Sequence, residues 1–195
     1  MSLFLTNFVI IMEDLKIIKR IQNGEKNLFG KIYEKYVDEI YKFIYLKTTN
    51  TEISEDLTSE TFFSALKNIF KFDTNSKDAN FRARIYKIAY NKTINHYKIC
   101  DRETGICEYI DLPCEQDFAG DLDNKEEIKN ILSYLKTLSD NERNVIIYRI
   151  WHDLSFKEIS EILGISLDNC KKISSRTLKK INSNFLILLF IFLIF

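Results

Sequence analysis

The side chains best placed for chemistry in this sequence are cations that recur at helical spacing near the carboxyl end. If residues 166–181 form a helix, one face carries four basic or hydroxyl side chains three or four residues apart: Lys172, Ser175, Arg176 and Lys179. The opposite face carries Cys170, Ile173, Thr177 and Ile181. Basic and hydroxyl groups on one exposed face can bind the phosphates and base edges of duplex nucleic acid. The spacing therefore predicts a nucleic-acid-binding helix.

Two helices joined by a tight turn would position this basic face. Ser155 and Glu158 have the spacing of a capping box, which predicts a helix start. Gly164 stands where that helix would end, and a second helix is expected from Ser166. A short helix, a glycine turn and a basic second helix are typical of a helix-turn-helix, whose second helix enters the major groove. An ordinary helical hairpin with a solvated charged face is the alternative.

A second run of cations lies in the middle of the chain. Between Asn80 and Cys100 there is no carboxylate, and lysines and arginines alternate with aromatic residues. Such a surface suits a single nucleic-acid strand, because cations bind the phosphates while exposed bases stack on the rings. A core helix with a solvated cationic face has the same pattern. The helix expected here spans about residues 79–99.

The expected helix before it, from Glu52 to about Phe70, has two faces. Its apolar residues are predicted to face the core: Ile53, Leu57, Phe62, Phe63, Leu66 and Ile69. Its outer face carries Glu52, Glu55, Asp56, Ser59 and Glu60. Shorter helices are expected over residues 14–21 and, with a wide apolar stripe, over residues 28–44. A second capping box is expected at Ser139 and Glu142.

Composition predicts a soluble, helical, globular chain. The 195 residues include one proline and five glycines, and 28 basic residues balance 28 acidic ones. The charges are unevenly distributed. Residues 12–98 hold 16 basic and 12 acidic residues, residues 99–127 hold 2 and 10, and residues 128–182 hold 10 and 6. Two mildly basic blocks therefore flank an acidic connector.

Apolar segments stand at both ends of the sequence, and neither has a single interpretation. The first eleven residues are apolar without the basic start of a signal peptide, and an incorrectly assigned start codon is one interpretation. The apolar tail, residues 185–195, is too short to span a bilayer alone. It can insert partway into a membrane, cover another protein surface or be a misread end of the frame.

Four cysteines without a secretory leader predict free thiols in a reducing compartment. The alternative is a zinc site at His96, Cys100, Cys107 and Cys114. The spacing of these residues is looser than that of the compact cysteine pairs in structural zinc sites.

Three stretches together resemble bacterial RNA polymerase sigma factors of the extracytoplasmic-function (ECF) group. They are SEDLTSETFFSAL (54–66), FRARIYKIAYNKTINHYK (81–98), and ILSYLKTLSDNERNVIIYRI (131–150) followed by the helix-turn-helix. The resemblance implies an all-α fold with sigma region 2 at 12–99 and region 4 at 128–182. A flexible acidic linker at 100–127 would join them, with extensions at 1–11 and 183–195. Alternatives are a helix-turn-helix regulator that dimerises on a palindromic operator, and a membrane-tethered interaction protein.

The resemblance also implies three sets of binding residues. Core RNA polymerase would dock, through a coiled coil of its largest subunit, on Asp56, Leu57, Glu60, Thr61 and Phe62. The melted minus-ten strand would bind Asn80, Arg82, Arg84, Lys87, Asn91 and Lys98. The minus-thirty-five duplex would bind Asn169, Lys171, Lys172, Ser175, Arg176 and Lys179. Two positions depart from the family's pattern: Arg84 replaces a common tryptophan, and Tyr90 a common arginine.

The implied partners are core polymerase, through its largest and flap-bearing subunits, promoter DNA and an anti-sigma factor. No cofactor, metal or catalytic residue is expected, because the sequence shows no paired carboxylates, metal cluster or nucleophile constellation, and polymerisation belongs to the partner. The implied location is cytoplasmic and nucleoid-associated, or membrane-associated when an anti-sigma factor holds the protein there.

Overall fold

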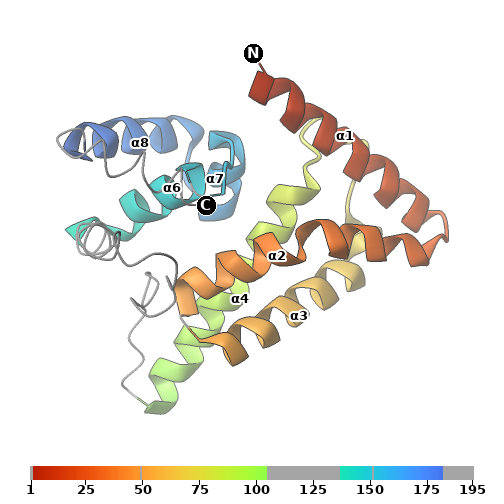
Figure 1. The fold of residues 1–195 in the computed structure, drawn as a ribbon, viewed down its shortest axis with the longest axis horizontal. Helices are drawn as coiled ribbons and strands as arrows, with labels where there is room; N and C mark the ends of the chain where they lie inside the picture. The colour runs from red at the N-terminus through yellow and green to blue at the C-terminus, as the bar shows by residue number, and fades with distance from the viewer. Residues whose placement is uncertain (1, 49, 105–136, 151, 182–195) are drawn as a thin grey trace, which may run out of the picture. The chain divides into compact units, whose positions relative to one another are not determined.

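The computed structural model describes residues 2–48, 50–104, 137–150 and 152–181. Within these ranges all regular structure is helical, which confirms the all-α prediction. The helices form two compact units, α1–α4 and α6–α8 (Figure 1). Most of the predicted acidic linker and the tail at 183–195 lie outside the described residues. In the described ranges, no helix combines the length and the apolar character that crossing a membrane requires.

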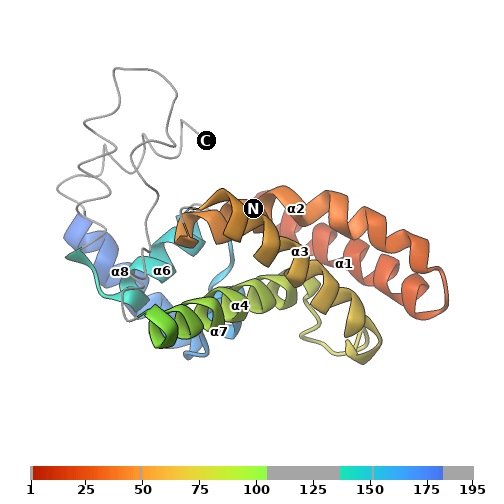
Figure 2. The same ribbon diagram turned by 90° about the horizontal axis from the view of Figure 1, so that it is seen from below.

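The first unit is a bundle of four helices. They are α1 (Ser2–Gln22), α2 (Phe29–Thr48), α3 (Thr51–Lys67) and α4 (Phe81–Thr104), with short 3₁₀ helices at Lys26–Leu28 and Ile69–Lys71. Figures 1 and 2 show α2 and α3 side by side, and α4 packs on both. The core includes Ile18, Ile40, Phe43, Phe62 and Ile85. Four faces thus bury one apolar interior, which fixes the direction of α4.

Local signals start the helices of this bundle largely where the sequence predicts. The Asn50 side chain accepts a hydrogen bond from the Ile53 N–H at 3.0 Å and caps α3. Two differences occur. The first helix begins at Ser2 and runs past Met12 without a break, whereas residues 14–21 were expected. The fourth runs to Thr104, beyond the expected end.

Two residues of α3 that were predicted to face the core, Phe63 and Leu66, are exposed. Phe62 is buried, but Phe63 is 69% exposed and Leu66 is 37% exposed. Neighbouring residues of a helix point about 100° apart, so Phe62 and Phe63 cannot both face the bundle interior. The apolar run therefore leaves aromatic surface on the outside of α3.

The second unit contains a helix-turn-helix. Its helices are α6 (Asp140–Ile150), α7 (Phe156–Leu163) and α8 (Leu167–Ile181), and all three pack on one another. The predicted capping box is present: the Ser155 hydroxyl accepts from the Glu158 N–H at 3.2 Å, and the Glu158 carboxylate accepts from the Ser155 N–H at 2.7 Å. Gly164 ends α7 at φ +70°, in the left-handed region that glycine adopts easily.

The cysteines meet the expectation of free thiols only in part. Cys170 is free and buried in the helix-turn-helix, but Cys100 is disulfide-bonded. Spacing along a chain does not say which thiols meet in space. Cys107 and Cys114 lie outside the described residues. Among the residues that the structure describes, no three or more His, Cys, Asp or Glu side chains form a group that could hold a metal ion.

Candidate nucleic-acid interface

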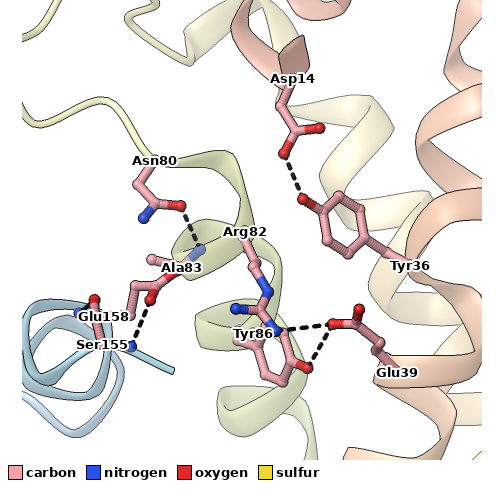
Figure 3. A network of polar contacts seen from close by, with 9 residues as sticks. All are labelled: Asp14, Tyr36, Glu39, Asn80, Arg82, Ala83, Tyr86, Ser155 and Glu158. Carbon is pink, nitrogen blue, oxygen red and sulfur yellow. Dashed lines mark hydrogen bonds and ion pairs between the residues drawn. The ribbon is translucent and has the colours of Figure 1, made fainter. Parts of the chain in front are cut away.

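The amino end of α4 is fixed by Asn80. Its side-chain oxygen accepts a hydrogen bond from the Ala83 N–H at 3.0 Å (Figure 3). This is the geometry of an N-cap, which satisfies an N–H that the helix itself leaves without a partner. Asn80 is only partly exposed. The cap thus sets where the cationic residues of α4 begin.

Three predicted strand-binding residues form one line along α4. Arg84, Asn91 and Lys98 are seven residues apart, and all three are exposed. Seven residues advance a helix by about two turns, so these side chains project from the same face of α4. Lys87 is only partly exposed. The structure therefore offers an exposed polar and cationic stripe, composed of Arg84, Asn91 and Lys98.

The Arg82 side chain projects from the opposite face of α4, toward α2. It lies about 200° around the helix from Arg84, and its side chain is only 12% exposed. Its Nη2 lies 3.2 Å from Oε2 of Glu39, on α2, and its guanidinium lies over the Tyr86 ring, 5.6 Å from the centroid. The Tyr86 hydroxyl donates to the same Glu39 oxygen at 3.1 Å (Figure 3). Arg82 is thus held within the bundle.

The electrostatics of this cluster follow from burial. Tyr86 is fully buried, and desolvation, with a further contribution from Glu39, raises the pKa of its phenol well above the ordinary value. The phenol therefore stays protonated and remains a hydrogen-bond donor to Glu39. Glu39 accordingly ties two consecutive turns of α4 to α2.

On α3, the five predicted polymerase-binding residues divide into two groups. Asp56 and Glu60 are exposed, but Leu57, Thr61 and Phe62 are buried. The Thr61 hydroxyl donates to the Leu57 carbonyl at 2.7 Å, and the Phe62 ring contacts Tyr33 edge-on, with centroids 4.8 Å apart. Of these five residues, only the two acidic ones expose their side chains to a partner. The three buried residues hold α3 in place.

On α8, every predicted duplex-binding residue is exposed: Asn169, Lys171, Lys172, Ser175, Arg176 and Lys179. The intervening Cys170, Ser174 and Thr177 are buried. The Ser166 hydroxyl accepts from the Asn169 N–H at 3.2 Å, just before α8 begins. The helix therefore presents one cationic face outward and packs the other on α6 and α7.

Glu142 connects the start of α6 with the end of α8. Glu142, in the first turn of α6, lies 2.6 Å from Nζ of Lys180, in the last turn of α8. Glu142 also accepts from the Ser139 N–H at 3.1 Å and from its hydroxyl at 2.8 Å. These bonds, that of Lys180 foremost, lower the pKa of Glu142 to about 2. Glu142 thus reaches back to Ser139 as predicted and also holds α8.

Two polar residues of the site were missed from the sequence. Glu39 reaches Arg82 across 43 residues, and Lys92 of α4 lies 2.7 Å from Oε2 of Glu60 across 32 residues. Lys92 belongs to the predicted cationic run but not to the predicted strand-binding set. The absence of carboxylates from residues 80–100 was a signal that acidic partners would have to come from other helices.

The chain matches two models of known protein families and is similar to named relatives. The family model described as sigma-70 region 2 matches residues 32–102, and that of sigma-70 region 4 matches residues 134–182. The chain is similar to the ECF RNA polymerase sigma factor SigW of Bacillus subtilis, with 30% identity over 80% of this chain and 88% of that one. It is 28% identical to the ECF sigma factor BldN of Streptomyces coelicolor, over 85% of this chain and 63% of the relative's length.

Two solved structures share the fold. One is CnrH in complex with the cytosolic domain of CnrY, at a TM-score of 0.61 and 18% identity, over 88% of this chain and 96% of that one. The other is the sigma factor RpoE in complex with the anti-sigma factor NepR from Bartonella quintana, at a TM-score of 0.60 and 20% identity, over 80% and 94%.

Proposed function

Because this chain belongs to the ECF group of bacterial RNA polymerase sigma factors, we propose that it binds core RNA polymerase and directs transcription initiation at promoters. The observation that carries the proposal is the exposure of all six predicted duplex-binding residues on α8. A stand-alone dimeric regulator is not favoured, because both sigma regions match in order along one chain. Sigma factors are initiation factors, and the protein contributes no catalytic residue.

Core polymerase docks on the outer face of α3 in this proposal. Asp56 and Glu60 are the residues that meet it, since both carboxylates are exposed. Exposed carboxylates complement a cationic helical surface, where charge sets the orientation and speeds the encounter. Leu57, Thr61 and Phe62 contribute by fixing α3 against the bundle.

Promoter DNA binds both units. The opened minus-ten strand lies along the stripe of Arg84, Asn91 and Lys98, with Lys87 at its edge and Asn80 at its amino end. Arg82 takes part only if it exchanges Glu39 for a phosphate. The minus-thirty-five duplex accepts α8 in its major groove, where Asn169, Lys172 and Arg176 reach bases or phosphates.

The remaining assignments complete the proposal. Region 2 occupies residues 12–99 and region 4 residues 128–182, joined by the acidic linker. An anti-sigma factor restrains the protein; the structurally similar sigma factor RpoE forms a complex with the anti-sigma factor NepR. The protein acts in the cytoplasm at the nucleoid, and at the membrane when an anti-sigma factor retains it there.

Run-off transcription with core polymerase tests this function. Core enzyme without its own sigma factor should start at discrete sites on promoters of neighbouring genes only when this protein is added. Asp56→Lys should abolish co-elution with core polymerase, whereas Glu34→Lys, which reverses an exposed charge on α2, should not. If core enzyme gains no start-site selection, the function is wrong.

The duplex contact has its own test. Arg176→Gln should weaken holoenzyme binding to the minus-thirty-five duplex and reduce the slope of log affinity against log salt by about 0.9, for one phosphate contact. Lys19→Gln removes an exposed cation of α1 and should leave both quantities unchanged. Equal effects of the two substitutions would argue against α8 as the duplex-binding helix.

A further inference from the structure

We infer that Glu60 holds Lys92 away from nucleic acid in the free protein and releases it when Glu60 binds core polymerase. The inference rests on the proposed function and adds two assignments to it. Lys92 becomes a further strand-binding residue, and Glu60 becomes the residue that connects polymerase docking on α3 with strand binding on α4.

The contact joins the two surfaces directly. Lys92 Nζ lies 2.7 Å from Glu60 Oε2, and the two side chains are 24% and 60% exposed. In the described part of the chain, each is the other's only hydrogen-bond or ion-pair partner. Because α3 and α4 pack together, the pair bridges the polymerase-facing helix and the strand-binding helix.

Lys92 lies at the edge of the exposed stripe. It follows Asn91, the middle residue of that stripe, and is therefore displaced by about 100° around α4, toward α3. A lysine side chain has four rotatable methylene groups, so its ammonium can turn from α3 to a phosphate lying on Asn91 without any backbone movement. The reach of the side chain thus permits both contacts, one at a time.

Charge makes the two contacts alternative. While Glu60 pairs with Lys92, its carboxylate neutralises one cation beside the stripe, so an approaching phosphate meets one net positive charge fewer. A cation of the polymerase that binds Glu60 removes that neutralisation. The strand then meets one more positive charge on α4, in the same complex in which promoter opening takes place.

The strength of the pair suits such an exchange. Glu60 is exposed and Lys92 partly exposed, and ion pairs that water and salt can reach contribute little. A docking surface can therefore break this pair at small cost, and the pair can weaken strand binding only modestly, by about two- to fivefold. A deeply buried pair would not be released so readily.

Binding of a fluorescent oligothymidylate by the free protein tests the inference. Glu60→Gln should tighten binding about two- to fivefold more than Glu55→Gln, which removes from the same helix an exposed carboxylate that pairs with no cation among the described residues. It should also steepen the slope of log affinity against log salt by about 0.7, for one added phosphate contact on a single strand. The double variant Glu60→Gln, Lys92→Gln should return to the affinity of the Glu55→Gln variant.

Two outcomes would overturn it: equal affinities for Glu60→Gln and Glu55→Gln, or a gain that persists when Lys92 is also replaced. Equal melting temperatures of the variants would confirm that folding is preserved when the exposed Glu60 and the partly exposed Lys92 are replaced. Co-elution of the wild-type protein with core polymerase keeps the two hypotheses apart. If the wild type co-elutes and the variants do not differ, the inference alone fails; if the wild type does not co-elute, the proposed function fails.

Discussion

The Tyr36 hydroxyl, on α2, donates a hydrogen bond to the carboxylate of Asp14, on α1, and both side chains are buried. The second carboxylate oxygen lies 2.6 Å from Nζ of Lys35 (Figure 3 shows the Asp14–Tyr36 contact). Burial raises the pKa of Asp14, although the bonds from Lys35 and Tyr36 oppose this effect. The first helix is therefore attached to the bundle by a carboxylate whose ionisation is disfavoured.

This relationship predicts a pH-dependent stability. Because the pKa of Asp14 is higher in the folded chain than its ordinary value of 3.8, its contribution is fully present below that value and is lost as pH rises through the folded pKa. Asp14→Asn cannot ionise. The free energy of unfolding of the wild type minus that of Asp14→Asn should therefore decrease as pH rises from below 3.8. Urea denaturation of both proteins across this range measures it, and a constant difference would contradict the prediction.

Replacing Glu39 should destabilise the first unit. Glu39→Ala leaves the Arg82 guanidinium and the Tyr86 hydroxyl without their shared acceptor, at a cost of about 1–3 kcal/mol. Glu39→Gln keeps an acceptor and should cost less. Urea denaturation measures both, with Glu34→Ala, an exposed substitution on the same helix, expected within about 0.5 kcal/mol of wild type. A loss for Glu39→Ala as small as that of the control would mean that the cluster does not stabilise the fold.

Glu142 should stabilise the second unit only above acidic pH. Its folded pKa of about 2 lies below the ordinary 4.5, so the stabilisation is present above 4.5 and is lost as pH falls through about 2. Glu142→Gln should lower the free energy of unfolding by about 0.5–1 kcal/mol at neutral pH, and this difference should shrink on acidification. A double-mutant cycle with Lys180→Gln measures the pair itself. Additive effects of the two substitutions would show that the pair contributes nothing.

Two glycines should respond to alanine in opposite directions. Gly164 has φ +70°, and a Cβ there would meet no atom within 4 Å, so Gly164→Ala should cost about 1 kcal/mol from backbone strain alone. Gly30 lies within α2, also with open space, and Gly30→Ala should stabilise the protein by about 0.5–1 kcal/mol. Melting temperatures should move down and up, respectively. A shift in the same direction for both would refute the assignment of strain to Gly164.

Features that depend on neighbours along the chain were determined by the sequence itself. The capping box of Ser155 and Glu158 and the glycine turn at Gly164 are decided within one helical turn. The outward face of α8 follows from a period of 3.6 residues. The order of the two sigma regions is likewise a property of the chain, so the resemblance to the family does not depend on packing.

Tertiary structure alone decided which of these side chains are free to bind. Phe62 and Phe63 are equivalent in composition, yet only contact with Tyr33 and the bundle buries the first. Arg82 and Arg84 are equally basic, but Glu39, 43 residues away, holds one and leaves the other exposed. An ion pair or a buried face needs a partner from another helix, and the sequence contains no local signal that names that partner. Packing therefore determined which residues form the binding surfaces, within helices that local chemistry had already specified.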